Sequence, residues 1–337
     1  MIRAALLLAM LSLVLRMPPL RESAALQAPV GSPATEARSG PGEPQPFTLG
    51  VLRRDGIVIP FASFDGKRWS APWPEEIQFT ELPISIDAIA GKWWGKAGRP
   101  GELTIWSNGA RQGTLRLTGP AVLPIMCVRR LALYSTYQPP EPPPRPTVQP
   151  YLKDGLVISG SQPIAPIEIV PRTSPLWSST AVSLVEPFDD AETRAIKSFT
   201  DWKHPVARAA RRRLPVELET LYRAPMDTPG WTAYHVEAVK QYQPGKDDDD
   251  CGLVTYASGW LLAGPGGEHR IALGAQVSYC DRRDNTFMLP LGLIEQGGRS
   301  YWVYQVSGYE REGYAISRLL PKENQIQARY TAGTCAR

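Results

Sequence analysis

The last third of this chain alternates short β-favouring stretches with turn residues, and this alternation constrains the fold more than any other feature. Turn sequences such as Gly264-Pro265-Gly266-Gly267 and Pro321-Lys322-Glu323-Asn324 separate the stretches. The predicted strands are residues 216–222, 232–240, 253–262, 270–279, 286–294, 300–307, 313–320 and 325–331. Because short loops favour antiparallel pairing of consecutive strands, we expect a meander that forms a sandwich or a barrel.

The first half of the chain has the same organisation. Apolar runs at residues 47–52 and 57–61 flank Asp55-Gly56, a dipeptide typical of tight hairpin turns. No strand–helix–strand alternation is found in the sequence, which argues against a doubly wound fold. The sequence therefore predicts a mainly β fold with two antiparallel β domains, of sandwich or barrel type, and one short helical insertion.

A proline-rich segment separates the two predicted domains. Residues 138–150 carry seven prolines, which favours an extended, polyproline-like linker; an ordered loop on the first domain is the alternative. A length of 337 residues also exceeds that of most single cores. We predict an N-terminal β domain over residues 47–137 and a C-terminal β domain over residues 151–337, preceded by a disordered spacer over residues 26–46.

The predicted helical insertion spans residues 189–213. Ile196, Phe199 and Trp202 recur at three-residue steps behind an acidic start at 189–190, and Pro205 ends the helix near His204. We interpret His204 as a helix cap rather than a catalytic group. Four arginines follow, which we interpret as a solvated helix face that forms salt bridges with its neighbours; binding of an anionic lipid or an acidic glycan is the alternative. They are Arg208, Arg211, Arg212 and Arg213.

The first 25 residues predict export. Arg3 precedes an apolar run from Ala4 to Leu15, and small residues follow at 23–25, which is the order of a cleaved signal peptide. The run is shorter than the roughly 20 residues that cross a bilayer, so no transmembrane helix is expected in the mature chain. We expect a secreted or periplasmic protein, with an uncleaved signal anchor as the alternative.

The four cysteines fit an oxidising compartment, and their spacing excludes a simple cysteine–histidine zinc site. We predict two disulfides. Cys251 and Cys280 are near enough in sequence to join neighbouring strands, which leaves Cys127 to pair with Cys335. The formal net charge of +4 gives no electrostatic basis for nucleic-acid binding.

Two segments are candidate ligand sites. The run Asp247, Asp248, Asp249 and Asp250 offers oxygen ligands for Ca²⁺, but it departs from the EF-hand pattern, and a solvated loop is the simpler interpretation. Five tryptophans lie close to Asp65, Glu75, Glu76 and Asp87, an association found on sugar-binding surfaces. We expect at least three of the five to be structural. They are Trp69, Trp73, Trp93, Trp94 and Trp106.

Nucleotide-binding glycine loops and the G-x-S-x-G nucleophile motif are absent from the sequence, and the three histidines lie far apart. The sequence identifies no catalytic residue and no cofactor other than the possible Ca²⁺. We therefore expect a non-enzymatic envelope or secreted protein that binds a protein or glycan partner or has a structural role. The alternative is a secreted hydrolase that uses carboxylates on carbohydrate.

Overall fold

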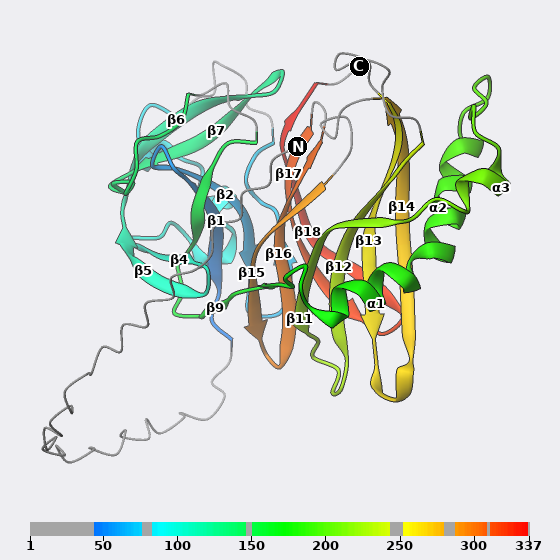
Figure 1. Ribbon diagram of the computed structural model, residues 1–337. Helices are drawn as coiled ribbons and strands as arrows, with labels where there is room; N and C mark the ends of the chain where they lie inside the picture. The colour runs from blue at the N-terminus through cyan, green and yellow to red at the C-terminus, as the bar shows by residue number, and fades with distance from the viewer. Residues whose placement is uncertain are drawn as a thin grey trace, which may run out of the picture. The chain divides into compact units, whose positions relative to one another are not determined.

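The computed structural model describes residues 44–75, 83–145, 150–242, 252–279, 287–308 and 311–335, which all belong to one compact unit (Figure 1). Three antiparallel sheets contain the strands of this part of the chain, which confirms the predicted mainly β fold. The signal peptide and most of the predicted spacer lie outside the described residues. Among the helices of the described ranges, none has the length and apolarity needed to cross a membrane.

The first sheet contains the strands predicted for the first half of the chain. Its order is β5-β4-β8-β1-β2-β7-β6, with β3 paired to β2. In the described ranges, three short 3₁₀ segments lie in connections between strands: η2 (Ile86–Ala88), η3 (Gly91–Ala97) and η4 (Pro265–Gly267). The strands are β1 (Phe47–Arg53), β2 (Ile57–Phe64), β3 (Trp69–Ser70), β4 (Leu103–Ser107), β5 (Ala110–Leu115), β6 (Leu117–Ile125), β7 (Val128–Ser135) and β8 (Lys153–Ile158).

The second half of the chain forms two five-stranded sheets. The helix-covered sheet has the order β10-β11-β12-β13-β14, and the central sheet has the order β18-β17-β16-β15-β9. The former contains β10 (Glu168–Ile169), β11 (Glu217–Pro225), β12 (Thr232–Gln241), β13 (Leu253–Ala263) and β14 (His269–Tyr279). The latter contains β9 (Ile164–Ala165), β15 (Phe287–Gln296), β16 (Arg299–Gly308), β17 (Arg311–Leu320) and β18 (Glu323–Thr334).

The predicted hairpin at Asp55-Gly56 joins β1 to β2. Gly56 has a φ of 78°, a left-handed conformation that glycine adopts without steric cost, and the Asp55 carboxylate accepts hydrogen bonds from Arg53. All side chains of β1 and β2 are buried, because packing covers both faces of these strands. This explains their unbroken apolar runs, since a strand buried on both faces does not alternate polar and apolar residues.

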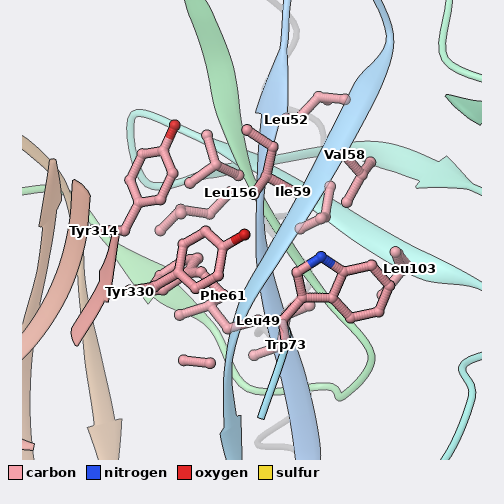
Figure 2. Packing of buried hydrophobic residues seen from close by; sticks show 14 of the residues in the cluster. Leu49, Leu52, Val58, Ile59, Phe61, Trp73, Leu103, Leu156, Tyr314 and Tyr330 are labelled. Atoms are coloured by element: carbon pink, nitrogen blue, oxygen red, sulfur yellow. The ribbon is translucent and has the colours of Figure 1, made fainter. Parts of the chain in front are cut away.

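The central sheet packs against both other sheets. One face contributes Tyr314 and Tyr330 to the core of the first sheet, where they lie near Phe61 (Figure 2). The opposite face contributes Trp302 and Ala315 to a second core, shared with β11, β12 and β13 of the helix-covered sheet. Each buried aromatic side chain stabilises the core to which it belongs through its large apolar area.

Strand β8 follows the proline-rich segment directly, and it pairs with β1 and β4 of the first sheet. Gly155 permits this pairing, because a side chain there would collide with the Trp106 carbonyl, and its φ of 150° is disfavoured for other residues. The first sheet therefore continues beyond residue 150. The division of the chain into two domains at residues 138–150 stays a prediction.

The helical insertion differs from its predicted bounds. It begins with α1 (Pro175–Ser183), continues with α2 (Val185–Lys197) and ends with α3 (Arg208–Arg211), so that Phe199 and Trp202 lie beyond α2. The Ser174 hydroxyl caps α1 by accepting a hydrogen bond from the Leu176 amide. Leu184, Phe188 and Ala191 pack on the outer face of the helix-covered sheet, next to β13 and β14 (Figure 1).

Candidate binding cavity

A cavity of about 480 Å³ lies on three neighbouring strands of the central sheet, β16, β17 and β18. This volume is in the range of sites that hold small ligands. The residues that line it are Val306, Arg311, Glu312, Gly313, Tyr314, Ala315, Arg329, Tyr330, Thr331 and Thr334.

Strand register decides which of these side chains share a face. Gly313 lies opposite Val306 on one side and opposite Thr331 on the other, and Ala315 lies opposite Arg329. Because directly paired residues point to the same face, these residues form one surface, on the side that carries the core shared with the helix-covered sheet. Gly313 adds no side chain to this surface and so leaves it open.

Two arginines give the cavity its charge. Arg311 begins β17 and Arg329 lies in β18; both side chains are exposed. Within the described parts of the chain, neither guanidinium group forms an ion pair. Among these residues no carboxylate neutralises either group, so its charge is available to solvent or to an anionic ligand.

The opposite face of the same strands carries a buried ion pair. The ammonium of Lys153, from β8, lies 2.9 Å from Oε1 of Glu312, and the Tyr314 hydroxyl donates a 2.6 Å hydrogen bond to that oxygen. Burial lowers the pKa of Lys153, and the charge of Glu312 opposes this shift. These contacts fix the backbone of β17 between the cavity and the core of the first sheet.

The end of β18 is attached to the first sheet at several points. The sulfur atoms of Cys127 and Cys335 are at disulfide distance, which confirms the predicted pair. Arg130 Nε donates a 3.0 Å hydrogen bond to the Ala332 carbonyl, and Met126 forms a bridge with Thr334. The strand that contributes Arg329 and Thr334 to the cavity is therefore held in place at its C-terminal end.

The buried phenols beneath the cavity predict a loss of stability in base. Burial, and next the charge of Glu312, raise the pKa of Tyr314 well above its usual range, and burial raises the pKa of Tyr330. When the pKa of a group is higher in the folded protein than in the unfolded chain, its contribution to stability is fully present below the pKa of the unfolded chain, about 10 for tyrosine. This contribution is lost as the pH rises through the pKa of the folded protein. Phenolate absorbance from these tyrosines should therefore appear only together with unfolding, as measured by circular dichroism.

Tyr314→Phe is the variant that tests this. This variant lacks one ionisable buried phenol. The pH at which half of it is unfolded in base should therefore be higher than for the native protein. Ionisation of all tyrosines while the near-ultraviolet circular dichroism stays native would contradict the prediction.

The five candidate tryptophans lie apart from this cavity. Trp69, Trp73 and Trp94 are buried in the core of the first sheet, as expected for structural residues, while Trp93 and Trp106 pack against it and are partly buried. The Trp73 indole donates a 2.9 Å hydrogen bond to the Leu131 carbonyl, and its ring lies 5.1 Å from that of Trp94. Sugar binding by these tryptophans stays a prediction.

The structure pairs arginines of the predicted basic cluster with acidic residues of α2. Arg208 contacts Asp189 at 2.6 Å, Arg212 contacts the same carboxylate at 3.4 Å, and Arg211 contacts Glu192 at 2.9 Å. Asp189 and Glu192 are buried, so these pairs attach α3 to α2. Arg213, which follows them, forms no ion pair among the described residues.

Several predicted sites cannot be placed. The Asp247–Asp250 run, Cys251 and Cys280 lie outside the described residues. In the described ranges, no group of three or more histidine, cysteine, aspartate or glutamate side chains is arranged to hold a metal ion. Calcium binding and the second disulfide stay predictions.

The sequence alone did not indicate that Arg311 and Arg329 line the same cavity. They are 18 positions apart in the sequence, and only the register of β17 on β18 brings their strands together. Arg329 lies in the last predicted strand, 325–331, but Arg311 precedes the predicted strand 313–320 by two residues, so no signal in the sequence marked the two arginines as a pair.

Comparisons with known proteins found no match: no family model, no curated protein and no solved structure resembles this chain.

Proposed function

We propose that this protein is an exported, non-enzymatic binding protein whose cavity on the central sheet binds a carboxylate group of an acidic glycan. The observation that carries the proposal is that Arg311 and Arg329 line one cavity and form no ion pair among the described residues. A guanidinium group binds a carboxylate through two parallel, charge-assisted hydrogen bonds. Thr331 and Thr334 line the same cavity and supply hydroxyl groups suited to a polyhydroxylated ligand.

Export is supported by two independent features. The order of charge, apolar run and small residues over positions 1–25 is that of a signal peptide. The Cys127–Cys335 pair is of the kind that persists in secreted or periplasmic proteins and is rare where thiols are kept reduced.

Binding without hydrolysis is supported by the acidic residues of the cavity. A glycosidase needs two carboxyl groups on either side of the bond that it cleaves. Glu312 is the one acidic residue among the described lining residues, and its carboxylate is occupied by Lys153 and Tyr314. Carbohydrate hydrolysis, the alternative function, gains no support from this arrangement.

The proposal predicts charge-selective binding. Isothermal titration calorimetry should detect binding of digalacturonate and not of galactobiose, which has a similar shape but no carboxylate. Arg311→Ala and Arg329→Ala should each weaken binding by about tenfold to a hundredfold, the loss expected for a charge-assisted hydrogen bond. Added salt should weaken binding to the native protein, because it screens exposed charges.

Arg299→Ala is the matched control. Arg299 is an exposed arginine of the same sheet, outside the cavity lining, and it forms no ion pair among the described residues. This variant should bind digalacturonate as the native protein does. Equal binding of galactobiose and digalacturonate, or an equal loss in Arg299→Ala, would overturn the proposal.

A further inference from the structure

Each of the three sheets has two edge strands in the described residues, and five of these six edges are short or protected. Backbone amides and carbonyls along an unprotected edge can pair with another chain, which short strands, prolines and charged side chains prevent. Strands β9 and β10 have two residues each. Strand β6 carries Pro120 and Pro124, which have no amide hydrogen, and the six-residue β5 carries the exposed Arg111.

The first sheet protects the edge of β18. The Glu75 carboxylate accepts a 2.8 Å hydrogen bond from the Thr331 amide, and Arg130 Nε donates a 3.0 Å hydrogen bond to the Ala332 carbonyl. The other end of the strand begins with the charged and exposed Glu323. A further strand therefore cannot pair along the whole of β18.

Strand β14 is the remaining edge, and it lacks such protection beyond its first two residues. It pairs with β13 through eleven consecutive residue pairs without a bulge. No other strand pairs with it among the described residues. Residues 271–279 contain neither a proline nor a charged residue. A long, regular and uncharged edge of this kind is suited to binding a further strand.

One contact identifies the backbone groups that face outward from β14. Arg194 of α2 donates a 3.2 Å hydrogen bond to the Leu273 carbonyl, so this carbonyl points away from β13. In a regular antiparallel strand the amide and carbonyl of one residue point to the same side, and the side alternates along the chain. The backbone groups of Ile271, Ala275 and Val277 therefore face outward with those of Leu273. Among the described residues, only the Leu273 carbonyl of this row has a hydrogen-bond partner.

The row requires an extended backbone as its occupant, and a second copy of β14 provides one. Antiparallel pairing of β14 with itself gives both copies identical contacts about a twofold axis. Overlap of all eleven residues places Gly274 of both copies at the axis and Arg270 opposite Ser278, so that like charges do not meet. The proline-rich residues 26–46 of the same chain cannot offer a regular row of amides.

We propose that β14 is a dimerisation edge, at which two copies of this chain pair antiparallel and join their helix-covered sheets into one sheet of ten strands. The exposed Arg194 side chain leaves the Leu273 carbonyl when the second strand binds. This interface is independent of the proposed glycan cavity, because no residue of β14 lines that cavity among the described residues.

Sedimentation velocity over a range of concentrations tests the proposal on the purified protein. The native protein should show a reversible monomer–dimer equilibrium. Ala275→Pro should stay monomeric, because it removes an outward amide and places the proline ring where the second strand would lie. That amide does not pair with β13, so the variant should keep the native circular dichroism. A native protein that is monomeric at every concentration, or a folded Ala275→Pro that dimerises as the native protein does, would overturn the proposal.

A lysine at the twofold axis supplies a second variant. The backbone of Gly274 accepts a side chain, since a Cβ built there would lie 3.9 Å from the nearest neighbour, the Ser258 carbonyl oxygen. Gly274→Lys should raise the dissociation constant of the dimer by about fivefold, because two like charges then lie opposite each other. Gly101→Lys adds the same charge at an exposed glycine in open space and should have no effect. An equal effect of the two substitutions would contradict pairing at β14.

Amide hydrogen exchange measured by NMR locates the interface directly. Exchange of the outward amides of Ile271, Ala275 and Val277 should slow as the protein concentration rises. The inward amides of Ala272 and Gly274 pair with β13 in both states, so they should be protected at every concentration. Dimer formation without any change in exchange of the outward amides would place the interface elsewhere and overturn the proposal.

Discussion

Replacing both cysteines of the Cys127–Cys335 pair with serine should lower the free energy of unfolding by about 5 kcal/mol. The pair closes a loop with a sequence separation of 208 residues, and the restriction of the unfolded chain by a crosslink grows with loop length. Cys335 also follows directly after β18, whose end it joins to the first sheet. Urea unfolding followed by circular dichroism measures the change.

Cysteine-to-alanine replacement at the same two positions is the control for the polarity of serine, and it should give the same loss. The native protein, reduced before unfolding, should be destabilised at least as much as either variant. Unfolding midpoints that agree between the native protein and both double variants would contradict a disulfide at this position.

Glu312→Ala should destabilise the protein by about 3–5 kcal/mol. The side chain is 2% exposed, and its removal leaves the Lys153 ammonium buried without its counter-charge and the Tyr314 hydroxyl without its acceptor. Leaving a buried charge without a partner is more costly than losing the attraction between two exposed charges.

Glu168→Ala is the matched control, because Glu168 pairs with Arg223 at 2.6 Å while both side chains are largely exposed. That variant should lose less than about 1 kcal/mol. The double variant Lys153→Met/Glu312→Leu should be more stable than Glu312→Ala, since it removes both charges together. Equal losses in Glu312→Ala and Glu168→Ala would show that burial of this pair has no energetic consequence.

The strands of this fold were predictable because their signals are local. Apolar runs bounded by turn residues gave the predicted strands at 253–262 and 300–307, and these lie within β13 and β16. The hairpin at Asp55-Gly56 was predicted for the same reason, since a tight turn depends on two adjacent residues.

Long-range pairing was not predictable. Strand β8 joins β1 and β4 across roughly a hundred and about fifty intervening residues, respectively, and no local pattern encodes those partners. The sequence did not indicate that the carboxylates of Asp189 and Glu192 are buried, because the arginines that pair with them follow 19 positions later. Helix α1 was missed because its apolar residues follow no strong helical period, although Ser174-Pro175 is a helix-start signal.

The register of a strand pair that contains bulges could not be predicted from the sequence either, and the cavity depends on such a register. The turn between β17 and β18 pairs Leu320 with Glu323, and simple counting from that pair would place Ala315 opposite Ala328. A bulge between Ile316 and Ser317 shifts the register, so that Ala315 lies opposite Arg329 instead. A shift of one residue moves a side chain to the other face, so the arginine's place at the cavity depends on a feature that the sequence does not reveal.

Arg311 and Arg329 are proposed to bind a carboxylate ligand together. The most direct measurement is an NMR titration of the arginine Nε–Hε signals with digalacturonate, with the signals of Arg311, Arg329 and Arg299 assigned from the three alanine variants. We expect saturable shifts of the Arg311 and Arg329 signals with a common dissociation constant, and an unchanged Arg299 signal. Shifts of all three signals to the same extent, or of neither cavity arginine, would contradict it.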